Sequence, residues 1–298
     1  MFSTPILFLI FNRPDTTQIV FDRIREIQPK KLYVSADAPR KDRPGEIEKC
    51  IQTRSIIDQV DWECEIKTLF RENNLGCKLS VSDAISWFFR EEEYGIILED
   101  DCLPDLSFFP FCEELLIKYK DDNRIGHIGG NCFLPNIISS NLSYDFCSIT
   151  HIWGWATWKR VWENVDIDFP FWKKAKNNRS FLFCNKWEEI YFSSFISDAL
   201  THRNGLNPWA VFYYYSLRLQ HQLSIYPSVN LVANIGLGDA NATHTTKSSK
   251  KLYIPSQQIL FPLQHPMYVM DNKFVNKKAI KYNFFSYKRI LRYFLHLY

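Results

Sequence analysis

The stretch Tyr94–Asp101 constrains this chain most strongly, because it joins an apolar run directly to a cluster of charge. The aliphatic run Ile96–Leu98 predicts a short buried strand. The three carboxylates of Glu99–Asp101 follow at once, and side chains that repel one another need a reason to gather there. One explanation is a solvated acidic turn. The other is a site for a divalent cation or a sugar nucleotide, because hard cations take oxygen ligands and open α/β sheets bind ligands past the carboxyl ends of their strands.

Apolar segments alternate with helical patterns through the first hundred residues. We expect strands at 5–11, 31–35 and 65–70 and a fourth from Ile96, with helices after Asp15 and at 46–60 and 79–90. This alternation predicts an α/β fold with a mostly parallel sheet flanked by helices. Each strand ends in polar or charged residues, so those ends are expected to line one rim of the sheet: Arg13, Asp37, Arg71 and Glu99–Asp101.

The second half of the chain predicts an α+β arrangement. Cys102–Pro104 is expected to end the strand ladder, because proline has no N–H to donate. Further elements are expected as a helix at 108–120, a strand at 125–128, a loop at 135–145, helices at 159–163, 187–201 and 209–220, and an extended segment at 224–235. The segment 151–158 is expected to lead into the helix at 159. We divide the chain into 1–131, 132–250 and a basic aromatic extension, 251–298.

Composition excludes several classes of protein. The net charge of +3 is too small to indicate nucleic-acid binding. The eight cysteines form no Cys-x-x-Cys pair, which argues against a zinc site, and we expect them to be reduced and mostly buried. The apolar segment Phe2–Phe11 is too short to span a membrane and lacks a preceding basic segment. A cytoplasmic protein is expected.

The carboxyl-terminal end has a distinctive pattern of charge. From Asn272 onward there are seven Lys or Arg residues and no acid, interleaved with Phe, Tyr, Ile and Leu. This pattern is typical of a basic amphipathic segment that lies on an anionic membrane surface. The alternative is a terminal helix that packs on the protein and shows a basic outer face.

Five short motifs occur in an order and at spacings typical of one enzyme family. They are Phe11–Pro14, Val34–Asp37, Asn74–Gly76, Ile97–Asp101 and Pro104–Phe109. With them, the chain resembles the GT-A nucleotide-diphospho-sugar transferases, and within these the N-acetylglucosaminyltransferase I group and its bacterial relatives. The resemblance is strongest over residues 4–131, weaker to 163 and loose beyond.

The resemblance implies a role for each residue at the strand ends. Asp37 would hydrogen-bond the uracil edge of a UDP-sugar, and Arg13 would lie near the base or the phosphates. Asp100 would approach the ribose, and Glu99 would accept hydrogen bonds from the hydroxyls of the donor sugar. Asp101 would hold a divalent ion, Mn²⁺ or Mg²⁺, bridging the two phosphates. Alternatives stay open: Arg13 is also suited to a surface turn and Asp37 to a helix cap.

The residues of the acceptor side are less determined. The Gly-Trp pair ending in Trp155 resembles the family's acceptor-side loop, and Trp155 is our candidate for a sugar or donor contact, although closely spaced Trp residues usually belong to a core. His244 resembles a late histidine that ligates the metal or touches a phosphate in some GT-A enzymes. The alternative for His244 is a loop histidine bonded to the backbone.

An inverting transferase needs a base that takes the proton from the acceptor hydroxyl. The family members with this chemistry carry Asp directly after a Trp, whereas here Ala210 follows Trp209. Asp198 and Asp239 are the remaining candidates for the catalytic base.

The expected function is therefore a metal-dependent, inverting glycosyltransferase. It would move a hexosyl or N-acetylhexosaminyl group from a nucleotide-sugar donor to a hydroxyl of a glycan or lipid-linked glycan, as in polysaccharide biosynthesis. The basic tail would place it as a peripheral protein on the cytoplasmic face of a membrane. Two alternatives stay open: a nucleotidyltransferase, although no Gly-rich basic loop follows the first strand, and a catalytically inactive glycan- or membrane-binding module, which the missing Asp at Ala210 allows.

Overall fold

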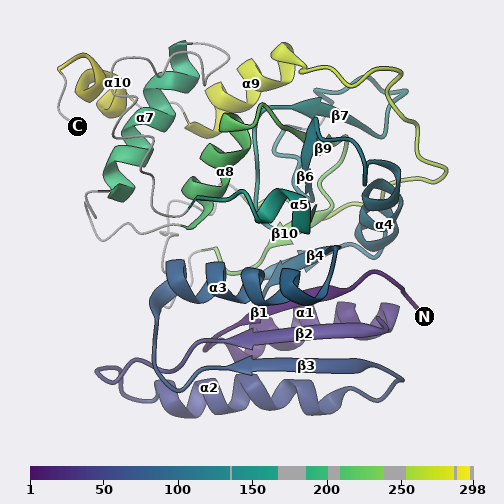
Figure 1. The fold of residues 1–298 in the computed structure, drawn as a ribbon, viewed down its shortest axis with the longest axis vertical. Coiled ribbons are helices and arrows are strands. Elements are labelled where there is room, and N and C mark those ends of the chain that lie inside the picture. The colour runs from purple at the N-terminus through teal and green to yellow at the C-terminus, as the bar shows by residue number, and fades with distance from the viewer. Residues whose placement is uncertain (135, 167–185, 201–208, 238–252, 285–286, 296–298) are drawn as a thin grey trace.

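Four apolar segments of the amino-terminal part lie side by side as parallel strands (Figure 1). This computed structural model describes residues 1–298 except 135, 167–185, 201–208, 238–252, 285–286 and 296–298. The strands are β1 (Ile6–Ile10), β2 (Lys31–Ala36), β3 (Glu65–Phe70) and β4 (Tyr94–Glu99). Strand β1 pairs with both β2 and β4 and is buried along its whole length, which is why its sequence is continuously apolar. The four predicted strands are confirmed.

Helices join these strands and flank the sheet. They are α1 (Pro14–Ile27), α2 (Glu46–Ser55) with the 3₁₀ turn η1 (Ile56–Gln59), and α3 (Gly76–Glu91). Pro14 starts α1, where a missing N–H costs nothing, and Gln28 ends it in a left-handed conformation with φ of 49°. Helix α1 packs with α2, whereas α3 packs with helices from the second half of the chain. The predicted α/β fold with flanking helices is thus observed.

The second half of the chain continues the same sheet. Strand β8 (Trp155–Trp158) pairs antiparallel with β4 and with β6 (Ile125–Gly129), and β9 (Leu223–Pro227) and β7 (Tyr144–Cys147) complete the order β3-β2-β1-β4-β8-β6-β9-β7. The other helices among the described residues are α4 (Phe108–Lys118), α5 (Lys159–Trp162), α7 (Lys186–Leu200), α8 (Trp209–Leu219), α9 (Lys273–Phe284) and α10 (Tyr287–Phe294). No helix in the described part of the chain is long and apolar enough to cross a membrane.

Two short strands differ from the sequence prediction. Residues 155–158 were expected only to lead into a helix, but they form a fully buried strand inside the sheet, where their aromatic side chains suit both faces. The ladder of the main sheet ends before Cys102–Pro104, as expected, but these residues were not predicted to form a strand of their own, β5, which pairs antiparallel with β10 (Val232–Asn234). Pro104 is the last residue of β5 and pairs with Val232. Its missing N–H donor therefore breaks no hydrogen bond within the β5–β10 ladder.

Two clusters of buried side chains form the core. The first unites β1, β2 and β4 with Trp155, Tyr213 and Leu263, so it includes residues on both sides of the predicted boundary at 131. The second includes Cys132, α8 and the buried face of α9, namely Val275, Ala279 and Ile280. The division into 1–131, 132–250 and 251–298 stays a prediction, although packing crosses both boundaries. The described cysteines form no disulfide, and five of them are buried, as expected: Cys50, Cys102, Cys112, Cys132 and Cys147.

Candidate active site

The candidate site lies where the strand order of the sheet reverses. From β1, the chain builds β2 and β3 outward on one side, and β4 then adds on the other side. The carboxyl ends of β1 and β4 are level, since Leu9 pairs with Glu99. Such a switch point leaves a crevice beyond the two strand ends, which is where open α/β sheets bind their ligands. Arg13 and the acidic triplet Glu99–Asp101 follow these two strands and therefore meet.

Arg13 forms ion pairs with two of the three acids. Its Nη1 lies 2.8 Å from Oδ2 of Asp101, and its Nη2 donates to Oδ1 of Asp100. The backbone N–H of Phe11 donates to Oδ2 of Asp100 over 3.2 Å. Burial opposes the charge on Arg13, but Asp100 and Asp101 outweigh it and raise the pKa of the guanidinium above its ordinary value. The structure thus brings together Arg13, Asp100 and Asp101 on the rim that the strand ends were expected to line.

Glu99 differs from its two neighbours because the described residues offer its carboxyl no hydrogen bond or ion pair. Burial, followed by the negative charges of Asp101 and Asp100, raises the pKa of Glu99 to about 8. Burial also raises the pKa of Asp100 to about 6, although Arg13 acts in the opposite direction. One guanidinium therefore faces three carboxyls, and burial raises the pKa of two of them, Glu99 and Asp100.

Asp37, at the end of β2, anchors the start of α3. Its carboxylate accepts hydrogen bonds from the backbone N–H groups of Ala38, Leu75 and Gly76, at 2.9 to 3.2 Å. The side chain of Asn74 donates to the carbonyl of Ala38 over 2.6 Å. The helix-cap role left open for Asp37 is therefore observed, and the Asn74–Gly76 motif is the turn that this cap holds. A contact between Asp37 and a nucleotide base stays a prediction.

Gly236, two residues after the end of β10, lies against the ion pair between Arg13 and Asp101. The N–H of Ile235 donates to the carbonyl of Asp101 over 2.8 Å, which brings the chain after β10 against the acidic triplet. A Cβ added at Gly236 would lie 2.5 Å from Oδ2 of Asp101 and 2.7 Å from Nη1 of Arg13. A side chain there would displace the pair, so the close approach requires glycine. Sequence reasoning missed this role; the signal was the Gly236–Gly238 turn after an extended segment.

The other predicted site residues are placed differently. Trp155 is fully buried in β8, stacked between His127 and Trp209 at ring-centroid distances of 5.4 and 5.7 Å. With no exposed surface, its ring is a core element, and we do not carry it into the proposed donor site. Asp198 is buried on α7, a helix that packs against α8, α9 and α10, and its role as a base stays a prediction. Asp239 and His244 lie outside the described residues.

The acidic triplet fits a hard divalent cation by its donor chemistry. Carboxylate oxygens are the ligands that Mg²⁺ and Mn²⁺ prefer, and the excess of negative charge over Arg13 favours a cation. Within the described residues, no group of three metal-ligating side chains converges. A bound ligand that carries phosphates would supply further oxygen ligands, so such a site would need fewer protein side chains. Asp101 is the described residue that would hold the cation, and His244, the other predicted ligand, lies outside the described residues.

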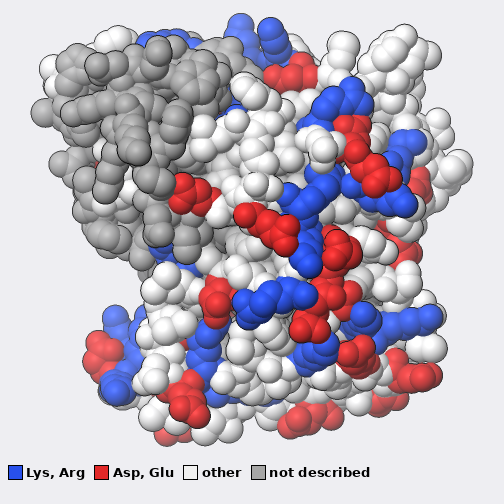
Figure 2. All heavy atoms as spheres, viewed as in Figure 1, with Lys and Arg blue, Asp and Glu red and all other residues white. Residues whose placement is uncertain are grey.

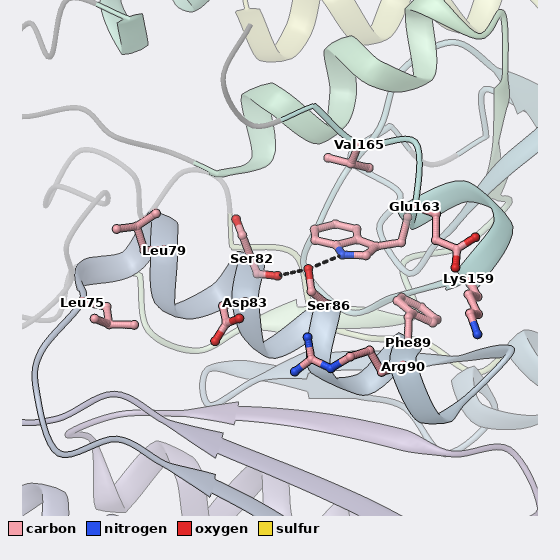
Figure 3. Close-up of a pocket in the computed structure, with 11 residues that line it drawn as sticks. Leu75, Leu79, Ser82, Asp83, Ser86, Phe89, Arg90, Lys159, Glu163 and Val165 are labelled. Atoms are coloured by element: carbon pink, nitrogen blue, oxygen red, sulfur yellow. Dashed lines mark hydrogen bonds between the residues drawn. The ribbon is translucent and has the colours of Figure 1, made fainter.

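A groove of about 700 Å³ runs along α3 and was not predicted (Figure 3). One end of the groove is at Leu75, whose backbone N–H donates a hydrogen bond to the carboxylate of Asp37. This end therefore lies at the rim of the candidate site. Leu75 and Leu79 are partly exposed there, and the indole of Trp162 donates to Oγ of Ser86 over 2.9 Å in its wall. Asp83, Arg90, Lys159 and Glu163 supply its polar groups.

Comparison with known proteins identifies no family. No protein-family model and no curated protein matches the chain. Among solved structures, HddC from Yersinia pseudotuberculosis shares 9% identity over 55% of this chain and 79% of its own, with a TM-score of 0.33. The 4-diphosphocytidyl-2C-methyl-D-erythritol synthase from Anaerococcus prevotii shares 12% identity over 65% of this chain and 84% of its own, with a TM-score of 0.32. A197 from STIV shares 10% identity over 77% of this chain and 83% of its own, with a TM-score of 0.35. At these scores the likeness carries no functional weight.

Proposed function

We propose that this chain is a metal-dependent glycosyltransferase that uses a nucleotide-sugar donor. The observation that carries the proposal is the meeting of Arg13 with Glu99, Asp100 and Asp101 at the switch point between β1 and β4. A phosphate-bearing ligand in that crevice needs positive charge against its phosphates, and its hydroxyl groups need buried acceptors. This cluster supplies both at the adjacent carboxyl ends of β1 and β4.

Each residue of the cluster has a definite task in the proposal. Arg13 presents its guanidinium to the phosphates, while its pairs with Asp100 and Asp101 keep the two carboxylates from repelling each other. Glu99, which has no partner among the described residues, accepts hydrogen bonds from donor-sugar hydroxyls. Asp101 would hold the divalent cation, whose chemistry when bound would be to neutralise charge on the leaving diphosphate. Asp198 and Asp239 remain the candidates for the base.

We further propose that the groove along α3 receives the part of the acceptor that extends away from the transfer centre. It starts beside Asp37 and combines apolar surface at Leu75 and Leu79 with charged groups farther along the helix. A glycan or a lipid-linked glycan would match this lining, because its apolar faces can pack on the leucines and its hydroxyl groups can hydrogen-bond the charged side chains. The volume lies in the range of small-molecule sites, roughly 300–1,000 Å³.

The experiment that tests the function is thermal denaturation with a panel of nucleoside diphosphates and nucleotide sugars, with and without Mn²⁺. Ligand at 100 times its Kd stabilises the folded state by about 2.7 kcal/mol, which raises the midpoint by several degrees. We expect one nucleotide sugar to stabilise the protein in the presence of metal. Asp101→Asn should abolish that shift, whereas Asp121→Asn, at a side chain that is 88% exposed, should keep it.

Three other outcomes would contradict the proposal. If no nucleotide stabilises the chain but oligosaccharides do, it is a glycan-binding module. If a nucleoside triphosphate and a sugar phosphate are converted to a nucleotide sugar and pyrophosphate, it is a nucleotidyltransferase. If Asp121→Asn loses the shift as fully as Asp101→Asn, the acidic triplet is not the nucleotide site.

A further inference from the structure

The exposed face of α9 combines lysines with aromatic rings. Val275, Asn276, Ala279 and Ile280 form the face that packs on the protein. The opposite face is exposed and carries Lys273, Phe274, Lys277, Lys278, Lys281 and Tyr282. In Figure 2, Lys and Arg side chains gather along the top edge of the molecule, where Figure 1 shows α9. The aromatic rings lie among these charges rather than in a core, with Phe274 58% exposed and Tyr282 52% exposed.

Helix α10 follows directly and turns apolar side chains to solvent. Tyr287, Leu291 and Phe294 are 79%, 62% and 63% exposed. Their offsets of four and seven residues place them on one face of the helix. A helix that packs only on its own protein would bury this face. A terminal helix that packs on the protein and shows only a basic outer face would account for α9. It would not account for the exposed apolar side chains of α10.

The charge of this surface indicates the kind of partner that it fits. Beyond Asp271 the chain has seven basic residues and no acid, so this segment attracts a negatively charged partner; Asp145 and Asp271 lie at the start of α9, where they contact Asn272 and Asn276. Exposed aromatic and leucine side chains beside lysines are the composition of helices that lie at the boundary between lipid headgroups and acyl chains. A nucleic acid would use the lysines and leave the apolar face of α10 in water.

We propose that α9 and α10 together form a docking surface for an anionic lipid bilayer. The lysines of α9 contact acidic headgroups, and the apolar face of α10 enters the headgroup boundary with the helix parallel to the membrane plane. This inference is independent of the proposed glycosyl transfer, because it rests on other residues and holds for any function of the strand-end site.

Vesicle co-sedimentation of the full chain tests the proposal. We expect binding to vesicles of phosphatidylserine and phosphatidylcholine, weak binding to pure phosphatidylcholine, and loss of binding as salt rises. Each lysine near an anionic surface contributes a factor of about five, so Lys277→Gln/Lys281→Gln should bind roughly 25-fold more weakly. Leu291→Ser/Phe294→Ser should bind at least about tenfold more weakly, because less apolar area enters the membrane.

Matched variants on another surface serve as controls. Lys30→Gln/Lys49→Gln removes two exposed lysines, and Ile47→Ser/Ile51→Ser removes side chains on α2 that are 55% and 62% exposed. These variants should bind like the parent, and all four should keep its melting temperature. Equal binding to neutral and anionic vesicles would overturn the proposal, as would equal losses in the controls. Binding of an RNA or DNA oligomer through the same lysines, with no vesicle binding, would also overturn it.

Discussion

Glu99 carries the clearest chemical signature of any single residue in the site. It ends β4 beside two other acids, and its carboxyl has no partner among the described residues. Burial and the adjacent charges both disfavour its ionised form, which raises the pKa to about 8. A carboxyl in this position suits the role proposed for Glu99, an acceptor of hydrogen bonds from the hydroxyls of the donor sugar.

The raised pKa makes a prediction about stability and pH. A carboxyl whose pKa is higher in the folded than in the unfolded state stabilises the fold at low pH, and this contribution is lost as pH rises from about 4.5 to about 8. Glu99→Gln stays neutral throughout. Its melting temperature should therefore rise relative to the parent as pH is raised over that window, because other titrating groups are common to both proteins.

The measurement is thermal denaturation of both proteins at intervals across the same pH range. A constant difference in melting temperature would show that Glu99 ionises like an ordinary exposed glutamate. Added Mn²⁺ should reduce the difference at the upper end of the range, because a bound cation favours the carboxylate.

Trp155 and Asp101 show how far residue types alone locate a site. Both were predicted from short motifs, but Asp101 lies in the strand-end cluster and Trp155 in the core. A carboxylate beside a strand end is costly to bury without a partner, so its position is constrained by charge. A tryptophan suits a core and a ligand surface equally, so its environment depends on which strands pack around it.

At the level of elements, β2 and α3 are joined through Asp37. The carboxylate accepts from the first N–H groups of α3, which have no partners within the helix. Asp37→Asn leaves a single side-chain oxygen for these donors, and we expect the free energy of unfolding to fall by about 1–2 kcal/mol. Urea denaturation without ligand measures this, with Asp121→Asn as the exposed control. No change in the midpoint would mean that water replaces the cap and that Asp37 serves the ligand alone.

The groove along α3 makes a second prediction for an element. Leu79 is 49% exposed at its near end, so Leu79→Arg should fold normally while its long charged side chain obstructs the groove. We expect the nucleotide-dependent thermal shift to be unchanged and sugar transfer to the acceptor to fall at least tenfold, mostly through a higher acceptor KM. Ile117→Arg, at a similarly exposed position on α4, is the matched control. A loss of nucleotide binding in Leu79→Arg would place the groove within the donor site.

For the whole molecule, the pairing of β8 bears on whether the chain forms separate domains. Strand β8 pairs with Tyr94–Ile97 of β4 and with Gly129 of β6, so the parts before and after residue 131 share one sheet and one core. We expect the full chain to unfold in a single transition that circular dichroism and tryptophan fluorescence report together. A fragment of residues 1–131 should be unfolded or aggregated, because it exposes the edge of β4 and the apolar surface beneath β8. Cooperative unfolding of that fragment, with nucleotide binding, would instead establish the boundary at 131.

The amino-acid sequence was sufficient for the first four strands, the helices between them and the meeting of Arg13 with the acidic triplet. Those features depend on local periodicity and on one rule, that parallel strands place their carboxyl ends at the same edge. The position of β8 between β4 and β6, the glycine that covers Asp101 and the groove along α3 depend on contacts between residues far apart in the chain. Strand pairing and close packing depend on which of many possible contacts between distant segments are most stable together. A local sequence pattern does not contain that information, so these features became evident only in the folded chain.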